Sequence, residues 1–250
     1  MDFKGVKWNN KTYNELIKYL NSLSSSSYKD FNKKIVNSKY EVLGVSVPVL
    51  KKLAKELSKT DYKSLLKLMK FNTYEEVILA FLIISNIKDY KEATNYLKEY
   101  IKYIDSWGVT DTFASSFKIV KKNKEQTLLL IDELIKDEYT FSKRLGYILL
   151  LDYYIDREHL RLIFDYIKKE ESKEYYVQMA ISWLLSVMYV KYTNETYDFL
   201  KDSNLDDFVV RKTVSKVQDS FRVSKEDKER IKTILKDMWN LITYLIFSSY

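Results

Sequence analysis

The chain has 250 residues, of which 46% are hydrophobic and 31% charged, and its formal net charge is +7. This length allows a substantial core, and four Gly with a single Pro leave few positions for tight hairpins, so the composition favours helices over sheets. The absence of Cys and the single His exclude disulfides, zinc fingers, thiol nucleophiles and nearly all histidine chemistry. Carboxylates are left for any acid–base role, and we expect no metal and no cofactor.

The positive charge, with a pI near 9.1, favours a polyanionic partner such as nucleic acid. No segment reaches the ~18 apolar residues that a membrane helix needs, and no signal-like segment opens the chain. We therefore expect a cytoplasmic protein without membrane contact.

Apolar residues recur at three- and four-residue steps along the whole chain, separated by short polar breaks. The pattern predicts helices that pair in antiparallel fashion. In chain order the predicted helices span residues 12–21, 28–36, 47–57, 62–70, 74–87, 91–104, 109–122, 126–136, 141–155, 158–169, 175–192, 195–201, 208–221 and 225–244.

A repeat becomes visible when the longer predicted helices are aligned on a small or slim residue. The aligned positions are separated by 34, 32, 34 and 34 residues. Two helices per unit at this period, with no strand signal, predict an α-solenoid of HEAT-like or tetratricopeptide-like pairs that bury their faces by stacking. We expect one domain over 1–250, and the apolar segment 240–250 is either packed helix or an atypical end. The aligned residues are Ala80, Ala114, Gly146, Ala180 and Val214.

Four residues are candidates for a site because an indole and a carboxylate suit a flat cationic ligand, and an arginine suits a phosphate. Trp107 and Trp183 are the indoles, Asp111 is the carboxylate and Arg144 is the cation on the lip of the pocket. Ordinary alternatives exist for each. Trp107 would pack under a helix start, Asp111 would stabilise a first turn, Trp183 would be core, and Arg144 would form a surface ion pair.

Basic residues are also placed where a nucleic acid would be met. The stretch 208–236 carries nine Lys or Arg against four acids, although solvated helix faces have the same composition. Lysines that neutralise phosphates release counterions and supply nonspecific affinity. The predicted DNA contacts besides Arg144 are Lys118, Lys143, Arg211, Lys212 and Arg222.

Taken together, several segments resemble the DNA alkylation repair glycosylases of the AlkD type, over about residues 28–238. The resemblance lies in the entry segment 40–57 with its Leu-Gly-Val and proline, in the Trp107 and Asp111 pair, in Arg144, in the string that ends at Trp183, and in segment 209–224. It implies a right-handed, C-shaped solenoid of HEAT-like antiparallel pairs with a basic concave face for duplex DNA.

The activity that the resemblance implies is the excision of cationic N3- or N7-alkylated purines by a monomeric, monofunctional glycosylase. Asp111 would stabilise the sugar cation and orient water, Trp107 and Trp183 would clasp the lesion, and Arg144 would hold a phosphate. Two alternatives stay open: a noncatalytic binder of DNA structures, and a protein-interaction solenoid suggested by 22 Tyr and the apolar C-terminal segment.

Overall fold

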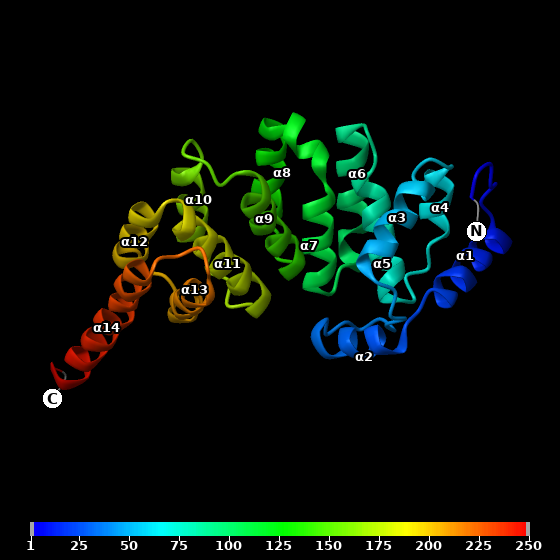
Figure 1. Ribbon diagram of the computed structural model, residues 1–250. Helices are drawn as coiled ribbons and strands as arrows, with labels where there is room; N and C mark the ends of the chain where they lie inside the picture. Colours follow the sequence, from blue (N-terminus) through cyan, green and yellow to red (C-terminus); the bar gives the residue numbers. More distant parts are fainter. Residues whose placement is uncertain (1–2, 249–250) are drawn as a thin grey trace. The chain divides into compact units, whose positions relative to one another are not determined.

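The computed structural model describes residues 3–248, with side chains through residue 237 (Figure 1). Within this part the regular secondary structure is helical, apart from one isolated bridge between Glu41 and Thr73, and loops join the helices. The all-α prediction is confirmed, since each of the fourteen predicted segments holds one α-helix. The chain forms two compact units, Met1–Leu145 and Gly146–Tyr250, which are described separately below. The expectation of a single domain stays a prediction.

The first unit is built around α5, in which every residue is buried. This helix packs side by side with α3 and α7 (Figure 1). Thr73 and Glu76 cap its start reciprocally, which satisfies two backbone N–H groups at a buried helix end. The α-helices of this unit are α1 (Asn10–Ser22), α2 (Ser26–Ile35), α3 (Val47–Leu57), α4 (Tyr62–Leu68), α5 (Tyr74–Ser85), α6 (Tyr90–Tyr100), α7 (Trp107–Ser116) and α8 (Lys124–Lys136).

The boundary between the units falls within α9 (Thr140–Tyr153). In the second unit α11 and α13 pack against each other most extensively, and α13 and α12 both contact α14. Besides the end of α9, the helices of this unit are α10 (Leu160–Lys168), α11 (Tyr175–Lys191), α12 (Thr193–Asp202), α13 (Asp207–Asp219) and α14 (Lys225–Ser248). The apolar segment 240–250 lies outside the residues whose side chains the structure describes, so its predicted role is not addressed. None of the described helices is long and apolar enough to cross a bilayer.

The slim repeat positions are buried. Ala80, Ala114 and Ala180 have no exposed surface, Val214 has 2%, and Gly146 is also buried. A small side chain at each position lets the neighbouring helix approach closely, which is the physical origin of the repeat seen in the sequence.

Two predicted helices end earlier than the periodicity suggests. Helix α6 stops at Tyr100 and gives way to the 3-10 turn η1 (Ile101–Tyr103), and α7 stops at Ser116, ahead of the 3-10 segment η2 (Lys118–Lys122). The hydroxyls of Ser115 and Ser116 both donate to the carbonyl of Thr112, at 3.1 and 2.7 Å. Such bonds compete with the helical ladder.

A buried carboxylate holds the loop that precedes α3. Glu75 has no exposed surface and accepts backbone N–H bonds from Leu43, Gly44 and Val45 at 2.8, 2.8 and 3.2 Å. Gly44 has φ of +91°, and a Cβ there would lie 2.6 Å from the carbonyl oxygen of Ser25. The loop therefore requires both this glycine and this carboxylate.

We predict that Glu75→Gln lowers the free energy of unfolding by roughly 2 kcal/mol, because the amide turns a donor toward backbone N–H groups and leaves them unsatisfied. Urea unfolding measures the change. Glu41→Gln is the control, since that side chain is 65% exposed, and it should stay within about 0.5 kcal/mol of the unaltered chain. Equal stability of the two variants would contradict the assigned role of Glu75.

Candidate active site

The candidate site is centred on the N-terminal end of α7. Ser106 caps the helix, its hydroxyl oxygen accepting the N–H of Gly108 at 3.3 Å and its proton going to the carbonyl of Val36 at 2.7 Å. Gly108 is needed here because a Cβ would collide with the hydroxyl of Tyr74, whose pKa is raised by burial. The start of α7 is thus fixed by contacts with two segments distant in sequence, at Val36 and at Tyr74.

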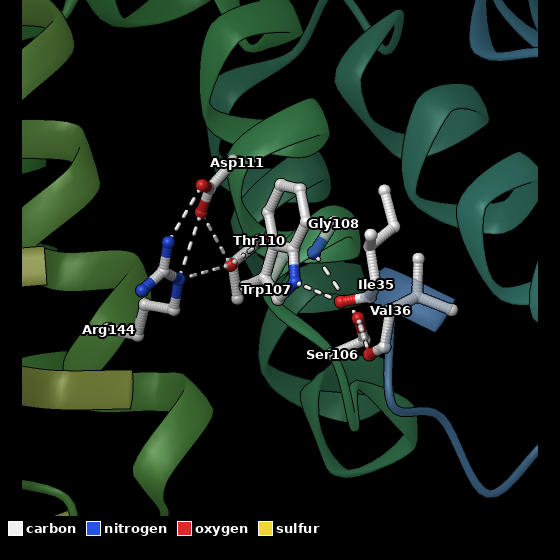
Figure 2. Close-up of polar contacts among 8 residues, drawn as sticks. All are labelled: Ile35, Val36, Ser106, Trp107, Gly108, Thr110, Asp111 and Arg144. Atoms are coloured by element: carbon white, nitrogen blue, oxygen red, sulfur yellow. Dashed lines mark hydrogen bonds and ion pairs between the residues drawn. The ribbon is translucent and has the colours of Figure 1, made fainter. Parts of the chain in front are cut away.

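Trp107 is the first residue of α7, whereas the sequence placed it before a helix that begins at residue 109. Its indole Nε1 donates to the carbonyl oxygen of Ile35 at 2.9 Å, at the last residue of α2 (Figure 2). The side chain is only half-buried. The indole is therefore oriented by a hydrogen bond and is not simply packed under the helix start.

Asp111 forms a two-point ion pair with Arg144 of α9 (Figure 2). Arg144 Nε donates to Asp111 Oδ1 at 3.0 Å, and Arg144 Nη2 donates to Oδ2 at 2.8 Å. Because α7 begins at Trp107, Asp111 lies beyond its first turn, and stabilisation by the helix dipole, which fades within that turn, does not explain the carboxylate. Asp111 is instead explained by its two hydrogen bonds to the guanidinium of Arg144, a geometry that suits a carboxylate.

The exposure of the two partners differs. The side chain of Arg144 is 6% exposed and that of Asp111 is 16% exposed. The sequence expectation of a cation on the lip of the pocket is corrected by this finding, because the guanidinium is buried behind the carboxylate and aimed at it. A phosphate contact by Arg144 stays a prediction, and it would require the guanidinium to exchange partners.

Thr110 completes the cluster. Its hydroxyl lies 2.9 Å from Asp111 Oδ1 and 2.8 Å from the carbonyl oxygen of Trp107, and it accepts from Arg144 Nε at 3.2 Å. A carboxylate offers about four acceptor positions. Among the described residues Oδ2 accepts only the Arg144 bond, so Asp111 keeps acceptor capacity on that oxygen.

Two further contacts hold the segment just before α7, one from the loop after α2 and one from the segment before α9, and neither was predictable from the sequence. Asp105 accepts from the Ser38 hydroxyl at 2.9 Å and from the backbone N–H of Lys39 at 2.6 Å. Tyr139 donates to the carbonyl of Ile104 just upstream. A polar residue before a helix is too common a pattern to be singled out from sequence alone.

The other predicted contacts of the first unit are both lysines. Lys143 is half-buried, and its Nζ donates to the carbonyl of Ile135 at 2.9 Å, near the C-terminal end of α8. Lys118 is exposed on η2. Their contact with DNA stays a prediction.

The predicted residues of the second unit are more exposed. Trp183 is 37% exposed although most of α11 is buried, so it is not the core residue that its apolar neighbours suggest. The Arg211 side chain is 40% exposed and lies 3.9 Å from Asp207, while Lys212 and Arg222 are exposed. Their roles in contacting the lesion and DNA stay predictions.

One group of possible metal ligands occurs among the described residues, formed by Asp156, Glu158 and His159 with ligand atoms within 4.8 Å of one another. His159 Nδ1 lies 2.5 Å from Asp156 Oδ1, a hydrogen bond that fixes the turn before α10. Acidic groups near a surface are common without a metal, and we assign no metal role here.

The fold and the site define an all-helical repeat protein with a carboxylate–arginine pair next to a half-exposed tryptophan. A family model described as DNA alkylation repair enzyme matches residues 16–217, and the chain belongs to that family. The resemblance seen in the sequence is thereby confirmed.

A solved structure described as a predicted DNA alkylation repair enzyme from Enterococcus faecalis has a similar fold, with a TM-score of 0.56 and 15% sequence identity. The similarity covers 86% of this chain and 98% of that one. A search of curated proteins found no match.

Proposed function

We propose that this chain is a monofunctional DNA glycosylase that releases cationic N3- or N7-alkylated purines from duplex DNA. Membership of the DNA alkylation repair enzyme family supports a role in repair. The observation that carries the finer proposal is Asp111, a partly exposed carboxylate oriented at two points by a buried arginine beside an oriented indole.

The proposed reaction needs no general acid for the leaving base. The bond between C1′ and the alkylated purine nitrogen breaks, its electron pair stays on the purine, and the base leaves neutral because it already carried positive charge. A carboxylate ~4 Å from the remaining sugar cation would stabilise it by ~4 kcal/mol at an effective dielectric near 20, or roughly a thousandfold in rate. Water then bonds to C1′ and loses a proton to Asp111 or to solvent, which leaves an abasic site.

Arg144 is assigned to the orientation of Asp111. Its fork occupies one position on each carboxylate oxygen and so holds the carboxylate in one orientation, with acceptor capacity left on Oδ2. An oriented, already desolvated carboxylate stabilises a developing cation more than a freely rotating one. Arg144 is thus a positioning residue in this proposal.

Trp107 would cover one side of the lesion, and Trp183 stays the second proposed aromatic contact. Attraction between an indole face and a cation contributes ~0.5 to 2 kcal/mol, more when water is excluded. Lys118, Lys143, Arg211, Lys212 and Arg222 are proposed to contact phosphates, and no cofactor is required.

We predict that Trp107→Phe lowers the rate of base release by roughly tenfold, because the ring loses its hydrogen bond to Ile35 and part of its attraction to the cation. Trp8→Phe is the matched control, since Trp8 Nε1 makes a bond of the same length, 2.9 Å, to Thr60 within the same unit. Single-turnover release of 7-methylguanine measures both. Equal losses would show that Trp107 acts only through stability.

The experiment that tests the proposed function is the release of free base from duplex DNA that contains 3-methyladenine or 7-methylguanine. Free base and abasic sites are expected in equal amounts. Binding of the methylated duplex without release would support instead a noncatalytic DNA binder, and absence of salt-dependent DNA binding would favour a protein-interaction solenoid.

A further inference from the structure

Thr110 lies between the two partners of the ion pair and is buried beneath them (Figure 2). The residue has no exposed surface, so bulk water does not compete for its hydroxyl. Thr110 Oγ1 is within hydrogen-bond distance of Arg144 Nε at 3.2 Å, of Asp111 Oδ1 at 2.9 Å and of the Trp107 carbonyl oxygen at 2.8 Å. The direction of these bonds decides what the hydroxyl does for the site.

The contact between Thr110 and Asp111 joins two adjacent residues of one helix. Adjacent positions of an α-helix point about 100° apart, and their side chains do not face each other. Here both side chains reach the same group of another helix, because Arg144 Nε is shared between Thr110 Oγ1 at 3.2 Å and Asp111 Oδ1 at 3.0 Å. The contact is therefore a property of the cluster around the guanidinium and not of α7 alone.

The single hydroxyl proton of Thr110 serves one acceptor at a time. The Trp107 carbonyl does not depend on it, because the helical pattern provides that oxygen with the N–H of Asp111, four residues on. Asp111 is the stronger acceptor, since hydrogen bonds to an ionised group are roughly twice as strong as neutral ones. Arg144 Nε donates to the same hydroxyl and polarises its O–H bond. All three arguments direct the proton to the carboxylate.

We propose that Thr110 donates its hydroxyl proton to Asp111 Oδ1 and is, together with Arg144, a positioning residue for this carboxylate. Oδ1 then accepts from Thr110 and from Arg144 Nε, while Oδ2 accepts from Arg144 Nη2. Oδ1 is thereby occupied, and Oδ2 is the oxygen left for the sugar cation. The inference rests on the proposed function and adds to it a second side chain that orients Asp111.

Thr110→Val tests this inference, because valine has nearly the same shape and lacks the hydroxyl. We expect single-turnover release of 7-methylguanine to slow about tenfold, as loss of one charge-assisted hydrogen bond allows. Affinity for the methylated duplex, measured by anisotropy, should stay within about twofold, because Thr110 is buried and is not proposed to contact DNA. Thr110→Ser keeps the hydroxyl and should release base at close to the unaltered rate.

Thr213→Val is the matched control. Thr213 also has no exposed surface and lies within a helix, α13, where its hydroxyl donates to the carbonyl of Val209 at 2.8 Å. The variant loses a buried hydroxyl that serves the backbone, and its base release should equal that of the unaltered chain. Equal losses in Thr110→Val and Thr213→Val, or a loss that Thr110→Ser does not rescue, would overturn the positioning role. An unchanged rate in Thr110→Val would do the same.

A second measurement does not depend on base release. Urea unfolding midpoints are compared for the unaltered chain, Thr110→Val, Asp111→Asn and the double variant. If the hydroxyl serves Asp111, Thr110→Val should lower the midpoint less than half as much when Asp111 is already replaced, since the charged acceptor is then absent. Equal lowering in both backgrounds would assign the proton to the Trp107 carbonyl and overturn the proposal. Should the unaltered chain release no base, the glycosylase proposal falls and this comparison still decides where the proton of Thr110 goes.

Discussion

Replacing Asp111 with Asn is expected to lower the single-turnover rate of 7-methylguanine release by about a thousandfold. The substitution keeps the shape of the side chain and removes the negative charge that would face the sugar cation, worth ~4 kcal/mol at a separation of ~4 Å. Affinity for undamaged duplex should fall little, because Asp111 is not proposed to contact phosphates. The effect therefore belongs to the chemical step.

Asp61→Asn is the matched control for this substitution. Asp61 is the N-cap of α4 in the same unit, its side chain accepts the N–H of Ser64 at 3.2 Å, and Asn caps helices equally well. Base release by Asp61→Asn should equal that of the unaltered chain. If Asp111→Asn also released base at the unaltered rate, Asp111 would have no part in the reaction.

Replacing Arg144 with Ala is expected to reduce both activity and stability. The buried guanidinium is the two-point partner of Asp111, and removal of one member of a buried ion pair costs about 3 kcal/mol because the remaining charge is left without compensation. Arg157→Ala is the control: Arg157 pairs with Glu195 but is 73% exposed, and such pairs contribute about 1 kcal/mol or less. Thermal unfolding should separate the two variants clearly.

A double substitution distinguishes positioning from general destabilisation. If Arg144 acts through Asp111, then base release by the Asp111→Asn, Arg144→Ala double variant should match that of Asp111→Asn alone, measured below the unfolding temperature of both. Multiplied losses in the double variant would mean that Arg144 contributes independently, for example through a phosphate. That outcome would restore the role expected from the sequence.

Much of the fold could be predicted because apolar periodicity and a slim residue at each repeat are local or nearly local signals. The helix ends were harder. Ser115 and Ser116 turn their hydroxyls onto the carbonyl of Thr112 in the last turn of α7, and a pattern of apolar residues does not register such competition with the helical ladder. The apolar pattern also gave the wrong start for this helix, since it predicted a helix from residue 109 whereas Trp107 is the first helical residue.

The site was predictable in part for the same reason. Asp111 and Arg144 occupy neighbouring positions relative to the slim residues of successive repeats, so the repeat alignment brought them close. Burial of Arg144 and its two-point bond to Asp111 depend on packing that the alignment does not contain. The contacts of Trp107 with Ile35, and of Glu75 with the loop at Gly44, join residues more than 30 positions apart and left no sequence pattern.

Mass-spectrometric detection of free base after incubation of the purified chain with duplex DNA containing 7-methylguanine tests the central claim most directly. The account predicts free 7-methylguanine together with an equal amount of abasic sites, and almost none of either with Asp111→Asn. Saturated binding of the methylated duplex with no free base above that released by buffer alone would contradict it.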